Sequence, residues 1–181
     1  MTKDIFIWSI IQCISIPKII FYRVFYGVHF SFGSIIWGFP KIRYGQQIQL
    51  WKWFQLGRLC RLAWNITIWK NFFMNEFWTI SAGANNNGKI SIGDNVLIGP
   101  FFYMVTWDHG FQKWENFNTS NSWKFADISI GNNVWIGARV TILKWVHIWD
   151  NVVIWAGSVV TKDIPSNSVA VGNPCRKIKE I

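Results

Sequence analysis

One of the three histidines in the chain, His109, lies in a context that could support catalysis. It follows Asp108 in a stretch, residues 107–127, that interrupts an otherwise regular pattern. Histidine titrates near neutral pH, which suits it to remove a proton from an attacking hydroxyl group. A single loop histidine is more often a solvated side chain, so residue type alone assigns no role. The sequence does not identify the group that would orient the imidazole, because Asp108 can point away; His29 and His147 have no comparable context.

Cations near the C-terminus form a second group with chemical potential: Lys162, Arg176 and Lys179. Their charges suit phosphate groups, although composition alone favours a solvated basic tail. The whole chain has a net charge of +9, which favours phosphates, acidic lipid headgroups or nucleic acid without choosing among them. No base-reading or stacking motif is present, so we expect no nucleic-acid partner.

The three cysteines indicate neither a metal site nor a covalent nucleophile. Cys13, Cys60 and Cys175 are scattered, odd in number and without metal-type spacing. No histidine lies at motif spacing from them, so an acyl-cysteine is not expected. Their pattern fits a reducing compartment such as the cytoplasm, and no cleavable signal peptide is evident.

The surrounding chain repeats with a period of six. Aliphatic residues, which we call the ladder, recur in three blocks: Leu50, Leu56, Leu62, Ile68, Met74 and Ile80; Ile92, Ile98 and Met104; Ile130, Ile136, Ile142, Ile148, Ile154 and Val160. An amphipathic helix needs apolar positions three and four apart, and hairpin strands need simple alternation. Period six instead predicts a β-solenoid whose coil has three flat faces, each contributing one inward aliphatic residue.

The repeat also predicts how the chain is divided. We expect an apolar N-terminal arm over 1–45, a parallel β-helix over 46–165 and a C-terminal tail over 166–181. The excursion at 107–127 leaves the coils, and long loops inside compact folds are usually functional. Period six does not fix the hand of the helix, and crossovers are normally right-handed.

Several of the 14 tryptophans stand where the repeat otherwise has glycine. The residue after the ladder position is glycine in five hexads and tryptophan in four, namely Gly57, Gly93, Gly99, Gly131 and Gly137 against Trp51, Trp69, Trp149 and Trp155. Trp53 and Trp145 share a later slot, three residues past the ladder. A bulky residue at a corner would be strained if it needed a positive φ. Either the rings point outward, or, as we favour, many of these residues are glycines encoded by a reassigned UGA codon.

The segment 128–179 carries the motifs NVWIG, AGSVVTKDIP and GNPCR. In combination they closely resemble the C-terminal half of the galactoside/maltose O-acetyltransferase group and related acetyltransferases of polysaccharide synthesis. FFMNEFWTISAG, ISIGDNVLIGP and YMVTWDHGF resemble the acceptor and catalytic region of that group. The resemblance covers residues 50–180 and implies a left-handed parallel β-helix of hexapeptide repeats.

By this resemblance His109 is the general base, because it occupies the position of the catalytic histidine in the family. The family often has one residue fewer before it. Asn75 matches an acceptor-binding asparagine, or is a corner residue of a coil turn, and Trp78 nearby replaces small residues of the family. Trp135 matches an aromatic near the catalytic cleft, or packs at a trimer seam. Because the family carries tryptophan in this motif, we take Trp135 as genuine.

The resemblance also implies acetyl-CoA as co-substrate, held along a groove between coils. The matching positions, from the pantetheine end to the nucleotide end, are Ala138, Ala156, Gly157, Thr161, Lys162, Arg176 and Lys179. Backbone groups beside the two alanines would bind pantetheine, and Gly157 leaves room for close approach. The family has arginine where Lys179 stands, which keeps the charge but weakens stacking on adenine.

We therefore predict an acetyl-CoA-dependent O-acetyltransferase acting on a saccharide, either a cell-surface polysaccharide precursor or a simple sugar. By resemblance it is a homotrimer with no metal, and backbone N–H groups stabilise the oxyanion of direct transfer. One alternative is the same fold acetylating serine, an antibiotic or an amino sugar. Another is a non-catalytic β-helix scaffold.

The apolar stretch 5–26 leaves the site of action open. Pro17, Lys18 and Arg23 interrupt it, whereas a membrane-spanning helix needs about 20 mostly apolar residues. It is predicted to be a helical arm that packs on the body or makes peripheral contact with a membrane surface.

Overall fold

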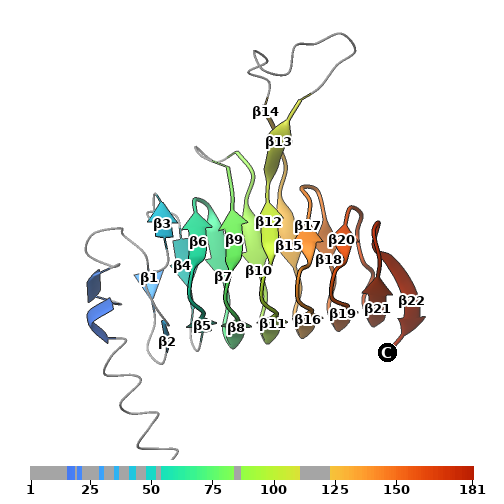
Figure 1. Cartoon of the computed structure of the whole chain (residues 1–181), viewed down its shortest axis with the longest axis horizontal. Coiled ribbons are helices and arrows are strands. Elements are labelled where there is room, and N and C mark those ends of the chain that lie inside the picture. The colour runs from blue at the N-terminus through green and yellow to red at the C-terminus, as the bar shows by residue number, and fades with distance from the viewer. Residues whose placement is uncertain are drawn as a thin grey trace, which may run out of the picture.

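The computed structural model describes residues 16–18, 20–21, 29–30, 35–36, 41–43, 48–51, 54–83, 87–110 and 123–181. Within these ranges the chain winds through three sheets, and the short strands of each sheet stack side by side along one common axis (Figure 1). The strands of consecutive coils are parallel, as the hexads predict. Because each coil visits the three sheets in turn, the turns form three corners, which we name A–B, B–C and C–A.

The sheets and their strands are as follows. Sheet A contains β1 (His29–Phe30), β4 (Ile48–Leu50), β7 (Ile66–Ile68), β10 (Ile90–Ile92), β15 (Ile128–Ile130) and β18 (His147–Ile148). Sheet B contains β2 (Ile35–Ile36), β5 (Phe54–Leu56), β8 (Phe72–Met74), β11 (Val96–Ile98), β16 (Val134–Ile136), β19 (Val152–Ile154), β21 (Ser168–Val171) and β22 (Arg176–Glu180). Sheet C contains β3 (Lys41–Arg43), β6 (Cys60–Ala63), β9 (Trp78–Ser81), β12 (Tyr103–Val105), β17 (Thr141–Ile142) and β20 (Val159–Val160). A separate antiparallel hairpin pairs β13 (Trp107–His109) with β14 (Trp123–Phe125).

The aliphatic ladder forms the core. Every ladder residue has an exposed fraction of 3% or less, and ladder residues of consecutive coils are direct partners, as Ile92 is with Ile68 and Ile130. Burying one such side chain contributes roughly 1.5–3 kcal/mol. The prediction of one inward aliphatic residue per face is therefore confirmed.

Consecutive coils approach closely at the residue after each ladder position. A Cβ built on Gly57, Gly93, Gly99, Gly131 or Gly137 would lie 2.3–2.7 Å from an atom of a neighbouring coil. Real Cβ atoms do not tolerate such distances, because the close-packed interior cannot give way. Glycine therefore allows the spacing of the coils at these corners.

The four tryptophans at the same slot leave their side chains about half exposed: Trp51 (46%), Trp69 (45%), Trp149 (51%) and Trp155 (50%). Trp51 and Trp69 stack with ring centroids 5.4 Å apart. None of the four has a positive φ, so strain from a left-handed backbone does not arise at this slot. The N–H of each of the four still donates to the next coil at 2.9–3.0 Å. That the natural protein carries glycine at these positions stays a prediction.

Most positive φ angles fall two residues further along, three past the ladder; Trp64, two past Leu62, also has a positive φ of 55°. Trp145 has φ 69° at this slot, and Phe77, Phe101 and Arg139 adopt φ between 56° and 60°. Asparagine, which tolerates this conformation, fills the slot along the A–B corner. Bulky residues in the left-handed region are therefore common in this chain and are not restricted to tryptophan; Trp53 lies outside the described residues.

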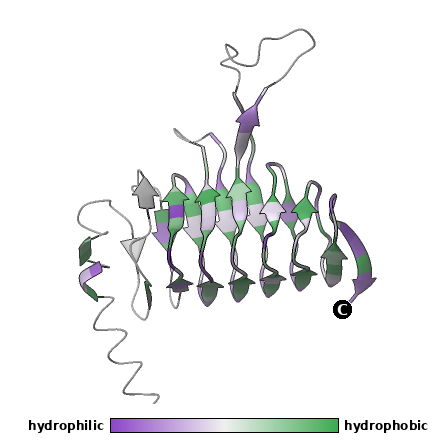
Figure 2. Cartoon of the chain, viewed as in Figure 1, coloured by the Kyte–Doolittle hydropathy of each residue, from purple (hydrophilic) through white to green (hydrophobic). Residues whose placement is uncertain are grey.

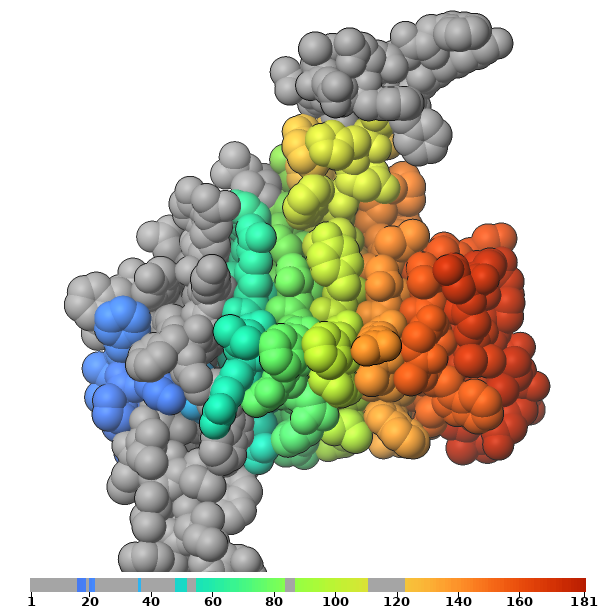
Figure 3. Space-filling model, viewed as in Figure 1, coloured from blue at the N-terminus to red at the C-terminus, as the bar shows by residue number. Residues whose placement is uncertain are grey.

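The hairpin of β13 and β14 projects from one side of the coils (Figures 1 and 3). The chain leaves the solenoid after Thr106, whose N–H still donates to the Ser81 carbonyl at 3.1 Å. It returns at Ile128, whose N–H donates to the Lys89 carbonyl at 2.9 Å. Ala126 N–H donates to the Thr106 carbonyl at 2.9 Å and closes the base. Residues 111–122 lie outside the described residues.

Most of the predicted arm at 5–26 also lies outside the described residues. Residues 16–18 and 20–21 are helical, and Lys18 Nζ donates to the Ile36 carbonyl of β2 at 3.4 Å. This contact favours packing of that segment on the body. Among the described residues, no helix has the length and apolar character needed to cross a membrane.

Candidate functional site

His109 is the last residue of β13 and its side chain is exposed. Its backbone lies opposite Trp123 of β14, and the two rings have centroids 3.9 Å apart at an interplanar angle of 37°. Trp107 meets the same indole edge-on at 5.1 Å. Within the described part of the chain, the imidazole forms no hydrogen bond, and its packing on Trp123 orients it. An exposed imidazole on a projecting hairpin is accessible to a substrate hydroxyl.

Asp108, the neighbour of His109, does not orient the imidazole. Its Oδ2 accepts a hydrogen bond from Lys144 Nζ at 2.6 Å. Lys144 belongs to the C–A corner between β17 and β18, which follows the hairpin by one coil. The carboxylate therefore connects the hairpin to the solenoid.

Thr161 and Lys162 occupy the C–A corner of the next coil, after β20, and both are exposed. Lys162 stands two residues past its ladder residue, as Lys144 does in the preceding coil. The N–H of Leu143 donates to the Val160 carbonyl at 3.0 Å and aligns the two turns. The C–A corner thus carries the root of the hairpin, Lys144 and Lys162 in consecutive coils.

Ala138, Ala156 and Gly157 lie together at the B–C corner. Gly157 N–H donates to the Ala138 carbonyl at 2.8 Å, joining the corners of consecutive coils. Gly157 has φ +74°, and a Cβ built there meets nothing within 4 Å. Asn75 is exposed at the same corner, two coils before Ala138, which at about 4.8 Å per strand is roughly 10 Å along the axis.

Arg176 and Lys179 lie on β22, the antiparallel strand that closes sheet B, and both are exposed. Figure 2 shows this strand as largely hydrophilic. Arg176 Nη1 donates to the Cys175 carbonyl at 2.7 Å, and Cys175 N–H donates to the Val159 carbonyl at 2.8 Å. The bond to Val159 and the pairing with β21 hold the cationic strand against the last coil, where its charges suit a phosphate-bearing ligand.

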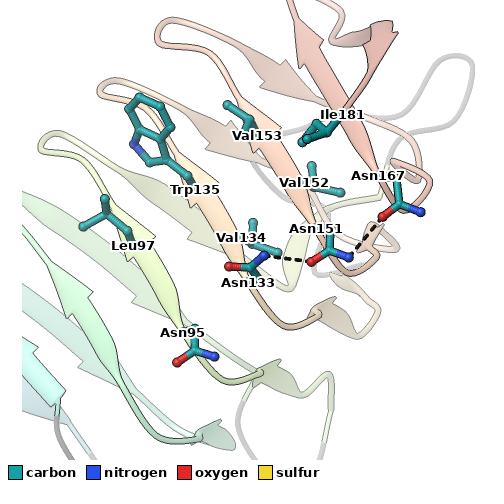
Figure 4. A pocket seen from close by; sticks show the side chains of 10 residues that line it. All are labelled: Asn95, Leu97, Asn133, Val134, Trp135, Asn151, Val152, Val153, Asn167 and Ile181. Atoms are coloured by element: carbon teal, nitrogen blue, oxygen red, sulfur yellow. Dashed lines mark hydrogen bonds between the residues drawn. The ribbon is translucent and has the colours of Figure 1, made fainter.

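Trp135 lies on the outer face of sheet B and is 55% exposed. It borders a groove of about 450 Å³ that ends at Ile181 (Figure 4). Along the groove, Asn133 donates to Asn151 at 2.8 Å and Asn151 donates to Asn167 at 3.0 Å. These hydrogen bonds between asparagine side chains link the A–B corners of consecutive coils beside Trp135.

One chain does not bring all the predicted residues to one place. Asn75, Ala138, Ala156 and Gly157 share the B–C corner, and His109 rises from the C–A corner with Thr161 and Lys162 nearby. Trp135 lies on sheet B, which is the face opposite the C–A corner. A site that contains both His109 and Trp135 would therefore need two copies of the chain.

The other ionisable groups show little that suggests chemistry. Burial raises the pKa of the Cys60 thiol to about 12 and also raises that of Cys175. The exposed Lys177 holds the pKa of Glu180 below its usual value. Among the described residues, no group of three His, Cys, Asp or Glu side chains is placed to hold a metal ion.

Two contacts of the site, those of Lys144 and Trp123, could not be predicted from the sequence. The position of Lys144 could have drawn notice, because it lies two residues past its ladder residue, as Lys162 does. Its partner could not be predicted, because the contact depends on the direction in which the hairpin leans. Trp123 gives no such signal, because its contact with His109 depends on the pairing of β13 with β14. Trp78 lies in the core with 2% exposure, so it fills the interior beneath β9 and does not line an acceptor pocket.

Comparisons with known proteins agree with this architecture. The family described as "Bacterial transferase hexapeptide (six repeats)" matches residues 127–162. Galactoside O-acetyltransferase of Escherichia coli (strain K12) is 47% identical over 117 residues, which is 65% of this chain and 55% of that protein. The crystal structure of a maltose O-acetyltransferase from Clostridium difficile 630 is 36% identical with a TM-score of 0.58, covering 82% of this chain and 70% of that one.

The chain belongs to the hexapeptide-repeat acetyltransferase family. Membership confirms the predicted left hand of the parallel β-helix. A galactoside acetyltransferase solved in complex with coenzyme A is 33% identical with a TM-score of 0.58, covering 82% of this chain and 65% of that one. The chain spans 55–59% of the length of the first curated relatives that it matches.

Proposed function

We propose that the protein is an acetyl-CoA-dependent O-acetyltransferase that acetylates a hydroxyl group of a saccharide, with His109 as general base. The observation that carries the proposal is the 47% identity to a galactoside O-acetyltransferase over 117 residues. The fold and the coenzyme A complex of a relative at 33% identity add support. The proposed acceptor is either a cell-surface polysaccharide precursor or a simple sugar.

His109 supplies the chemical step. Its imidazole removes the proton of the acceptor hydroxyl while the hydroxyl oxygen attacks the thioester carbonyl carbon. The new ester C–O bond forms, the C–S bond breaks, and the proton passes from His109 to the departing thiolate. Backbone N–H groups stabilise the negative charge on the carbonyl oxygen during transfer.

The residues of the chain fit acetyl-CoA as co-substrate. The open space over Gly157 permits close approach of a slender group such as pantetheine, with the backbone at Ala138 and Ala156 providing hydrogen-bonding groups. Thr161 and the exposed cations Lys162, Arg176 and Lys179 would bind the nucleotide and its phosphates.

A homotrimer, which the resemblance implies, is part of the proposal, and a site with both His109 and Trp135 would be shared between copies of the chain. The outward positions of sheet B form an apolar stripe in direct register: Phe73, Leu97, Trp135 and Val153. Three of these side chains are at least 36% exposed, and neighbouring exposed apolar residues mark interaction surfaces. Packing this face on another subunit would bring Trp135 to a neighbour's His109, with Asn75 contacting the acceptor. Light scattering should then give three times the 21.2 kDa of one chain.

The place of action is also proposed. Scattered cysteines favour the cytoplasm, and the apolar stretch 5–26 allows peripheral contact with a membrane that carries polysaccharide intermediates. Sedimentation of the full chain with anionic vesicles tests that contact, and absence of co-sedimentation argues for the packed arm.

A thiol-release assay tests the enzyme proposal. Purified protein is mixed with acetyl-CoA and a panel of galactosides, maltose, other sugars, serine and amino sugars, and free coenzyme A is measured. Turnover with a sugar that disappears in His109→Ala supports the proposal. Turnover with serine or an amino sugar alone would replace the saccharide hydroxyl by that acceptor in the proposal. No turnover with any acceptor would favour the non-catalytic β-helix scaffold.

A further inference from the structure

We propose that the ion pair between Lys144 and Asp108 is a brace that positions the catalytic hairpin, so that Lys144 is a positioning residue for His109. The inference rests on the proposed function of His109. It assigns a role to two residues that lie outside the acceptor and coenzyme A positions described above.

The pair spans two structural units. Asp108 belongs to β13, directly before His109, and Lys144 belongs to the C–A corner of the following coil. The Nζ–Oδ2 distance of 2.6 Å is that of a strong charge-assisted hydrogen bond. The Asp108 side chain, which is next to His109 in the sequence, therefore points to the solenoid and links β13 to it.

Burial makes the pair more than a surface contact. The Lys144 side chain is only 13% exposed, whereas that of Asp108 is 52% exposed. A lysine whose side chain is so largely buried is stabilised by a counter-charge, and Asp108 supplies one. Removing Asp108 leaves the charge of the largely buried Lys144 side chain without this partner, so the pair resists separation more than a fully exposed ion pair does.

The hairpin has few other restraints on its lean. Among the described residues β13 pairs only with β14, and the bond from Ala126 to Thr106 fixes the base, not the direction of the strands. The side chain opposite Asp108 on β14 is Lys124, which forms no ion pair in the described part of the chain. The bond to Lys144 is thus a side-chain tether between β13 and a coil.

The test measures steady-state kinetics of the full chain with acetyl-CoA and the accepted sugar. Lys144→Met and Asp108→Asn should each lower kcat by about tenfold or more, since small misplacement of a catalytic group has effects of this size. The KM for acetyl-CoA should change by less than about twofold. Lys144→Arg should restore most of kcat, and the double variant should fall no further than either single one.

Two matched controls separate bracing from general loss of charge. Lys124→Met removes a cation on the same hairpin. Lys70→Met breaks an ion pair at a distant corner, where Lys70 Nζ lies 3.2 Å from Asp94 Oδ2. Both should leave kcat unchanged. Hydrogen exchange of residues 103–110 gives a readout without turnover: Lys144→Met should speed it and Lys124→Met should not.

Defined outcomes overturn the brace. If Lys144→Met raises only the KM for acetyl-CoA while Asp108→Asn is normal, Lys144 binds the co-substrate directly. If both variants keep the parental kcat while His109→Ala is inactive, the proposed function stands and the brace is wrong. If the parent itself shows no turnover, the proposed function fails, and unchanged hydrogen exchange in Lys144→Met would refute the brace independently.

Discussion

Replacing Gly137 by alanine should destabilise the β-helix strongly, because the corner has no space for a methyl group. The Cβ would lie 2.5 Å from the Ala156 nitrogen and 2.9 Å from its Cα. These are backbone atoms and cannot rotate away, so the two coils must separate by about 1 Å to reach ordinary contact distance.

Separation of the coils weakens two hydrogen bonds at the same corner. Gly137 N–H donates to Ile154, and Gly157 N–H donates to Ala138, each at 2.8 Å. Overpacking costs about 1–3 kcal/mol and each weakened bond about 1 kcal/mol. We therefore expect a loss of roughly 3–5 kcal/mol, or a fall of about 6–20 °C in Tm for a chain of this size.

Gly157→Ala provides the comparison, because its Cβ would enter open space. The cost there comes only from φ +74° and should be about 1 kcal/mol. Thermal unfolding followed by circular dichroism at fixed protein concentration measures both variants. A Gly137→Ala variant that unfolds at the parental temperature, or later than Gly157→Ala, would refute the corner argument.

Three further predictions concern other parts of the molecule. Because its pKa is raised to about 12, the Cys60 thiol stays protonated at pH 8 and should resist alkylation until the protein unfolds; rapid labelling of native protein counts against this. Lys162→Gln should raise the KM for acetyl-CoA by about fivefold or more with little change in kcat, which steady-state kinetics will show. Trp149→Gly and Trp155→Gly should raise Tm, and intact protein from the native host should have the lower mass of glycine at these positions; UGG codons there would contradict the prediction.

The ladder shows why the fold could be predicted from the sequence. Each of Ile130, Ile136 and Ile142 faces the interior of a different sheet, and their spacing of six is a property of the chain itself. Period six therefore determines three faces per coil before any tertiary contact is known. The hand of the helix could not be read from the period and came from resemblance.

The candidate site was only partly predictable, for a physical reason. His109, Lys162 and Gly157 lie in motifs that the sequence displays directly, so they could be selected as candidates. The partner of Asp108 could not, because it depends on the direction in which a projecting hairpin leans over a later coil. The strain considered at the slot of Trp149 and Trp155 does not arise, because neither residue has a positive φ.

The most direct test of the account is mass spectrometry of the acceptor after incubation with acetyl-CoA. The account predicts that the parent chain converts a galactoside or related sugar to its O-acetyl ester. It also predicts that folded His109→Ala forms ester at about one hundredth of that rate or less. A parent that forms no acetylated sugar, or a His109→Ala variant that forms it at the parental rate, would contradict the central claim.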